Sequence, residues 1–166
     1  MSSGLLRAET MTALAEGWSN DWLWSLPLIV LTVLAHGFGL VEIREHVVWG
    51  MTAALGAKTS RAAYASVVAA TVLLLTALHA LEGAAWAYAY VALGALPDAR
   101  TAMLYSLSAM TTYGHAEIFL APQWRLMGAL EALNGMMLFG LTTAFLFSVL
   151  FSNWPSLHKR HPHGDR

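Results

Sequence analysis

The sequence contains no cysteine, which excludes disulfide bonds, thiolate metal sites and a cysteine nucleophile. Charged residues are also scarce. Only 11% of the 166 residues are Asp, Glu, Lys or Arg, whereas a soluble globular domain carries about a quarter. The 9 basic and 10 acidic residues give a formal net charge of −1. This balance offers no basic footprint for nucleic acid, so we expect no nucleic-acid partner.

Apolar residues make up 57% of the chain and are concentrated in long uncharged runs, which indicates that the bilayer is the solvent. About twenty apolar residues span a membrane as a helix. Three runs qualify, residues 22–41, 62–96 and 126–151. The second run has 35 residues and would reach about 50 Å as a helix, so it must tilt, break near Gly83 or project beyond the membrane. The sequence therefore predicts an all-α integral membrane protein with about three transmembrane helices.

The runs divide the chain into segments and suggest an orientation. Residues 1–20 are expected to be an interfacial or flexible segment, residues 21–61 the first transmembrane helix and a cytoplasmic loop, and residues 153–166 a cytoplasmic tail. With the tail inside, more basic residues lie on the cytoplasmic side than outside, which favours an N-terminus outside and a C-terminus inside the cell membrane. The inside set is Arg44, Lys58, Arg61, Lys159, Arg160 and Arg166, and the outside set is Arg7, Arg100 and Arg125.

The segment between the second and third runs is too short to span. Asp98 is a suitable N-cap for a helix beginning near Ala99. A helix over residues 101–111 would be about 16 Å long, half a bilayer. The polar stretch Thr112–His115 follows it, and the chain returns through residues 116–122. This pattern predicts a re-entrant loop, which persists at membrane depth only where it is buried in protein or lines a water-filled cavity.

The stretch YSLSAMTTYGHAEI resembles the pore region of potassium channels, in particular of small bacterial two-pore-domain-like members. The likeness covers residues 79–151, including HALEGAAWAYAYVALGALP before the loop and WRLMGALEALNGMMLFG after it. The family's commonest filter is T-V-G-Y-G-D, and Thr111 supplies the first threonine of the family's frequent T-T pair. Thr112, Tyr113, Gly114, His115, Ala116 and Glu117 fall in order on the six filter positions.

The resemblance implies that residues 62–152 form a pore domain with an outer helix, pore helix, filter loop and inner helix. It also implies a homotetramer that conducts cations passively, with K⁺ held by Thr112, Tyr113, Gly114 and His115 and no other cofactor or enzymatic activity. The physical reason is dehydration: rings of backbone carbonyls from four subunits replace the water around the ion. Pointing successive carbonyls at one axis requires positive φ, hence glycine. Besides other copies of the chain, the expected partners are lipids and permeant cations.

Two residues depart from the family pattern. Ala116 stands at the second filter glycine, where a left-handed conformation costs roughly 1–2 kcal/mol. His115 replaces tyrosine and introduces a ring that titrates near neutral pH. With Glu117 nearby, four such imidazoles would bind a divalent ion or make conduction depend on pH. The channel architecture is therefore better supported than selectivity for potassium.

The last run carries polar residues along one helical face. Glu131, Gly135 and Thr142 follow the spacing of a pore-facing stripe, with Gly135 near the family's hinge glycine. A ring of Glu131 would concentrate cations in the vestibule. Alternatively, Glu131 is buried and bonded to the pore helix behind the filter.

Ionisable residues within the other runs allow a competing function. His79 and Glu82 share a helical face at i and i+3, either as a hydrogen-bonded pair supporting the filter or as metal ligands. His36 lies alone on the first run and is expected to form an interhelical hydrogen bond. The alternatives to a pore are a membrane metalloprotein, another membrane protein in which the polar loop is simply extracellular, and an accessory membrane subunit, which would leave that loop unexplained. The metalloprotein ligands would come from His36, His79, Glu82, His115, Glu117 and Glu131.

Overall fold

The computed structural model describes residues 2–55, 61–114 and 117–152, and every regular element in these ranges is helical. The prediction that the protein is all-α is thus confirmed for the described residues. The elements are α1 (Ser2–Glu42), the π-helical segment η1 (Ile43–Trp49), α2 (Gly50–Leu55), α3 (Arg61–Ala92), α4 (Ala99–Met110), the 3₁₀ turn η2 (Pro122–Trp124) and α5 (Arg125–Ser152).

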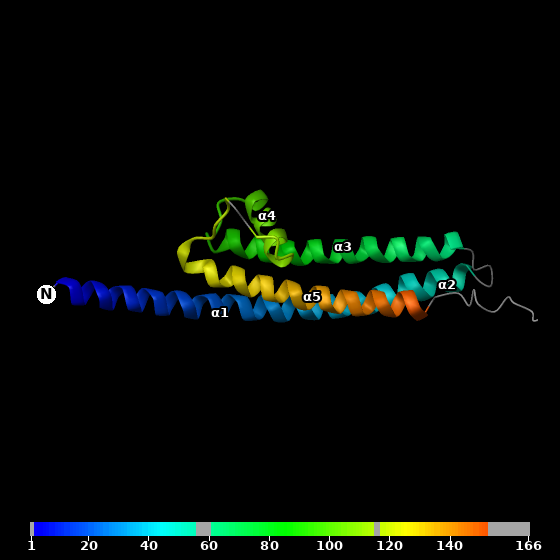
Figure 1. Ribbon diagram of the computed structural model, residues 1–166, viewed down its shortest axis with the longest axis horizontal. Helices are drawn as coiled ribbons and strands as arrows, with labels where there is room; N and C mark the ends of the chain where they lie inside the picture. Colours follow the sequence, from blue (N-terminus) through cyan, green and yellow to red (C-terminus); the bar gives the residue numbers. More distant parts are fainter. Residues whose placement is uncertain (1, 56–60, 115–116, 153–166) are drawn as a thin grey trace, which may run out of the picture.

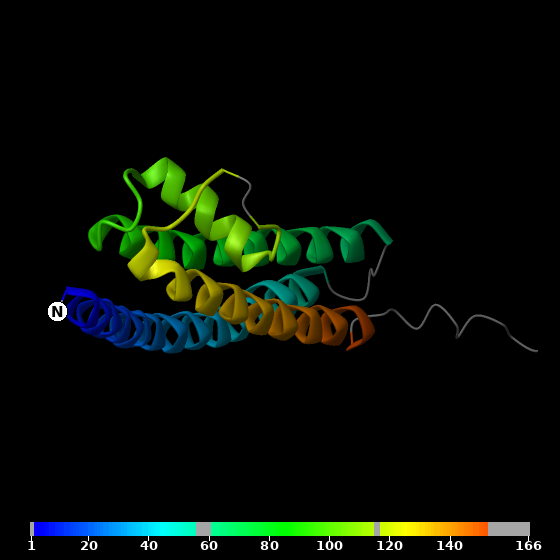
Figure 2. The ribbon, with the colours of Figure 1, turned by 60° about the vertical axis from the view of Figure 1, so that its left-hand side comes forward.

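Within the described ranges, three helical stretches are long and apolar enough to cross a bilayer: Trp18–Trp49, Ala62–Ala92 and Pro122–Phe151. This confirms the prediction of a multi-pass membrane protein. Figure 1 shows α1, α3 and α5 running along the long axis of the molecule. The short helix α4 lies beside α3 near the end where α3 finishes and α5 begins, on the side away from α1 (Figure 2).

The first helical region is longer than the sequence suggested. Residues 2–20 are continuous with the first span in α1, and the chain passes Val41 through η1 into α2 without leaving helical structure. The polar residues that follow Val41 have partners. Glu42 Oε2 lies 3.1 Å from His46 Nδ1, and Arg44 donates to Ser148 Oγ on α5. Glu42 and His46 lie on the exposed surface of the helix and Arg44 is hydrogen-bonded to α5, so these residues do not interrupt the helix.

The second apolar run forms one helix that ends before residue 96. α3 is unbroken at Gly83. It stops two residues before Gly94, whose φ of +66° is the left-handed conformation that commonly terminates a helix. The backbone of Ala95 and Leu96 then turns back to donate to the Tyr90 carbonyl.

Helix α4 begins where the sequence predicts. Asp98 has an extended backbone, and its carboxylate accepts from the N–H and the hydroxyl of Thr101 at 3.0 and 2.7 Å. These hydrogen bonds from Thr101 lower the pKa of the exposed Asp98 carboxyl below its ordinary value. With 12 residues, α4 is about 18 Å long and too short to cross a bilayer.

Small residues bring α4 against α5. A Cβ built at Gly135 would lie 2.6 Å from the Met110 Cα, so only glycine permits this approach of the last residue of α4. A Cβ at Gly128 would overlap the Tyr105 hydroxyl. Tyr105 itself meets Tyr90 of α3 edge-on, with ring centroids 5.3 Å apart. Buried apolar side chains fill the space between α3, α4 and α5, including Trp86, Tyr90, Leu96, Ala102, Ala109, Leu120 and Met127.

Candidate functional site

The chain leaves α4 in a tight turn that carries the predicted filter residues. Thr112 has φ +57° and Gly114 has φ +81°, and Thr112 is the one non-glycine residue of the described ranges with positive φ. A left-handed residue often ends a helix, as Thr112 ends α4, but the position usually holds glycine and costs a threonine roughly 1–2 kcal/mol. The Thr112–Gly114 segment is therefore neither helical nor an ordinary extended return.

The N–H groups of this turn point back at α4. Thr112 N–H donates to the Ala109 carbonyl at 2.9 Å, and Tyr113 and Gly114 N–H donate to the Ser108 carbonyl at 2.9 and 3.4 Å. All described peptide bonds are trans. In a trans peptide, the N–H of one residue and the C=O of the residue before it point in opposite directions. The carbonyls of Thr111, Thr112 and Tyr113 therefore point away from α4.

These carbonyls belong to an exposed segment. Residues 111–114 and Glu117 are all exposed within the single chain, and Tyr113 has 87% of its surface accessible. The predicted filter residues His115 and Ala116 lie outside the described residues. Tyr113 therefore presents a large aromatic side chain to the surroundings of the single chain, next to the main chain of the turn.

Behind the turn, Glu131 is fully buried between α3, α4 and α5. Its Oε2 accepts from the Tyr90 hydroxyl at 2.6 Å, and its Oε1 is hydrogen-bonded to Ser106 on α4. Ser106 Oγ also donates to the Gly83 carbonyl at 2.8 Å. One hydroxyl has one proton, so Ser106 makes both contacts when Glu131 is a neutral acid that donates to it. Of the two arrangements expected for Glu131, the structure has the buried one, bonded to α4, the helix that the sequence predicted as the pore helix.

The other residues of the predicted pore-facing stripe also face the chain's own helices. Gly135 abuts Met110 of α4, and the buried Thr142 hydroxyl lies 3.0 Å from ring nitrogens of His36 and His79. In this chain, Glu131, Gly135 and Thr142 therefore hold α5 against α1, α3 and α4. The periodicity had identified residues that share a face, but that face meets the interior of the bundle.

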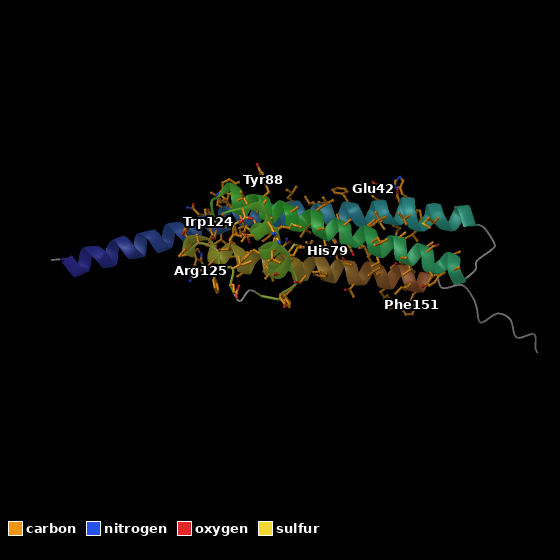
Figure 3. All side chains as sticks on the ribbon, turned by 90° about the horizontal axis from the view of Figure 1, so that it is seen from above. Glu42, His79, Tyr88, Trp124, Arg125 and Phe151 are labelled. Carbon is orange, nitrogen blue, oxygen red and sulfur yellow. The ribbon has the colours of Figure 1, made fainter. Side chains whose placement is uncertain are left out.

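His79 and Glu82 are brought together as their spacing predicts, and His36 of α1 joins them. His36 Nδ1 lies 2.8 Å from Glu82 Oε1, and His79 Nδ1 lies 3.4 Å from Glu82 Oε2. Figure 3 places His79 midway along the bundle, between Trp124 and Arg125 towards one end and Phe151 towards the other. The remaining described metalloprotein candidates lie elsewhere, since Glu117 is exposed and Glu131 is bonded to Ser106.

Three contributors to these polar groups were not singled out from the sequence: Ser106, Tyr90 and, as a partner of the histidines, Thr142. Hydroxyl-bearing residues in apolar helices commonly bond to their own backbone, so their types alone gave no signal. Ser106 lies one turn before the end of α4. Its contact with the Gly83 carbonyl could have been predicted only if α4 were known to pack against α3.

Comparison with known proteins yields no assignment: no protein family, curated protein or solved structure matches this chain.

Proposed function

We propose that this protein is the subunit of a tetrameric, cation-conducting membrane pore, with the Thr112–Gly114 segment as part of its ion filter. One observation carries the proposal: three consecutive carbonyls, those of Thr111, Thr112 and Tyr113, are turned away from α4 by the N–H groups that bond back to it. Main-chain carbonyl oxygens that are free of partners in the chain replace the hydration shell of a cation when several copies surround it.

The position of the segment supports the same proposal. It follows a helix of half a bilayer's length whose C-terminal end carries a partial negative charge, which favours a cation nearby. The Gly135–Met110 contact and the Ser106–Glu131 hydrogen bond hold that end against α5. The C-terminal end of α4 must be held in place, because the carbonyls that coordinate a cation have to keep their positions after the cation leaves.

Four copies explain the exposure of the turn. A single chain of three spans cannot enclose a pathway, and the carbonyls of one copy meet an ion from one side only. In a tetramer with its axis beside Thr112–Gly114, neighbouring copies would cover Tyr113, which is exposed in the single chain. With the orientation that the basic residues favour, the filter opens to the outside and the α5 C-terminus faces the cytoplasm.

The experiment is reconstitution of the purified protein. We expect a tetramer by light scattering in detergent and a K⁺ flux down its gradient in liposomes, measured beside Na⁺ because His115 and Ala116 leave selectivity open. A stable monomer or dimer that passes neither ion would contradict the proposal.

A further inference from the structure

A buried ring of four polar side chains lies in the middle of the bundle and plays no part in the proposed filter. Its members are Glu82, His36, Thr142 and His79, contributed by α1, α3 and α5. His36 is fully buried and Glu82 is 3% exposed. Ionisable groups this deep in apolar helices are costly and are found mostly where they have a function.

The ring is arranged symmetrically about the two imidazoles. Each Nδ1 faces the Glu82 carboxylate, at 2.8 Å for His36 and 3.4 Å for His79. Each Nε2 faces the Thr142 hydroxyl oxygen at 3.0 Å. His79 also stacks on Phe139 of α5 with ring centroids 4.3 Å apart, which holds its plane in this orientation.

Neutral histidines and an ionised Glu82 cannot satisfy every contact of this ring with their own protons. If both Nδ1 atoms carry hydrogen and donate to Glu82, both Nε2 atoms are acceptors, and Thr142 has one hydroxyl proton for the two of them. One buried ring nitrogen then faces an oxygen without a proton between them. In the structure the unsatisfied contact is on the Nδ1 side of the ring, where His79 Nδ1 and Glu82 Oε2 are buried without a hydrogen bond.

One additional proton in the ring, on Glu82 or on an imidazole, would satisfy all four contacts, and a metal ion resolves the mismatch in a second way. If both Nε2 atoms carry the proton, both donate to Thr142 Oγ, whose two lone pairs accept them. The two Nδ1 lone pairs and the Glu82 carboxylate are then free of protons and converge. One donor atom from each of His36, His79 and Glu82 lies within 4.8 Å of the other two. Ligands of a tetrahedral Zn²⁺ at about 2.0–2.1 Å stand about 3.3 Å apart, so the three donor atoms would move closer together by side-chain rotation on binding.

We propose that His36, His79 and Glu82 bind a divalent first-row transition metal ion of the Zn²⁺ type, with Thr142 as the shared outer-shell acceptor that orients both imidazoles. Two imidazoles and one carboxylate are a common ligand set for such ions. A water molecule or an open position completes the coordination. Metal-bound histidines nearly always donate their other N–H to a fixed acceptor, and Thr142 Oγ would be that acceptor for both rings.

The position gives the site a mechanical consequence. Thr142 is seven residues beyond Gly135, which contacts the end of α4, so the site lies about 10 Å further along α5. A bound ion would link α1 to α3 at that depth, and α5 would be held to this link through the hydrogen bonds of Thr142. The proposal does not rest on the pore: metal binding is measured in detergent, where no flux is involved, so either can fail alone.

The test uses full-length protein purified without a histidine tag, with His158, His161 and His163 changed to Asn so that the tail cannot bind metal. We expect one Zn²⁺ per chain after dialysis, and the visible absorption bands of four-coordinate Co²⁺ when cobalt replaces zinc. Glu82→Gln and His79→Gln should abolish both signals. The control His46→Gln removes an exposed histidine and should leave both unchanged.

Substitutions of Thr142 distinguish a metal site from a ring of hydrogen bonds that only stabilises the fold. Thr142→Val removes the acceptor of both imidazoles and should weaken Zn²⁺ binding by about 10–100-fold, while Thr142→Ser keeps the hydroxyl and should restore it. Absence of Zn²⁺ binding by the parent protein overturns the proposal, whatever the variants do. So does cobalt absorption that persists in a folded Glu82→Gln variant.

Discussion

Gly135 of α5 packs against the main chain of Met110, the last residue of α4, so closely that a Cβ there would lie 2.6 Å from the Met110 Cα and 2.8 Å from its carbonyl carbon. The obstacle is backbone, which cannot rotate away as a side chain would. The family resemblance predicts a hinge at this glycine, which stays a prediction; the structure shows that Gly135 contacts α4, the helix before the proposed filter.

Gly135→Ala should therefore destabilise the protein by about 1–3 kcal/mol, the usual cost of overpacking, and should displace the end of α4. Gly37→Ala in α1 is the matched control, because a Cβ built there meets nothing within 4 Å. The measurement is the thermal unfolding midpoint in detergent. Equal midpoints for the two variants would show that α4 does not approach α5 in this way.

Glu131 should be replaceable by its neutral isostere but not by an apolar residue. Because Ser106 contacts both Glu131 and the Gly83 carbonyl with one proton, a donor at position 131 fits the site. Glu131→Gln supplies an amide donor for Ser106 and an acceptor for Tyr90, and should change the free energy of unfolding by less than about 1 kcal/mol.

Glu131→Leu should cost more, since it leaves the buried Tyr90 hydroxyl without its acceptor, at about 1–3 kcal/mol for each unsatisfied group. The measurement is the thermal unfolding midpoint of each variant in detergent, and the Leu variant should have the lower one. A Gln variant as unstable as the Leu variant would mean that Glu131 is needed as an anion.

The cap of α4 should make stability depend on acid. Hydrogen bonds from Thr101 lower the pKa of Asp98 from its ordinary value of 3.8. The folded-state pKa is thus below the unfolded one, so this stabilisation is complete above about pH 4 and is lost as the pH falls through the folded-state value. Asp98→Ala should lower the unfolding midpoint at pH 7, and its deficit should shrink at pH 3. A deficit of the same size at both values would contradict a charged cap.

Local features of the fold could be predicted from the sequence. Asp98 and the length of the following apolar stretch predicted α4, because capping and helix length are decided by neighbouring residues. The spacing of His79 and Glu82 likewise predicted that their side chains would meet on one face of α3.

Contacts between distant segments could not be predicted in this way. His36 is 46 residues from Glu82, and which helices adjoin each other is set by packing of the whole bundle. The Glu131, Gly135 and Thr142 stripe illustrates the same limit. Periodicity shows which residues share a helical face. It does not show whether that face contacts lipid, another helix or a pore.

The central claim is that the backbone of Thr112–Gly114 coordinates passing cations, and a pair of glycine substitutions tests it most directly. Gly114 and Gly94 both have positive φ and open space at the Cβ position, so alanine strains each by roughly 1–2 kcal/mol. Gly94 ends α3, whereas Gly114 lies in the proposed filter. In liposomes, K⁺ flux should be lost with Gly114→Ala and retained with Gly94→Ala at equal tetramer content. Equal flux through both variants would contradict the account.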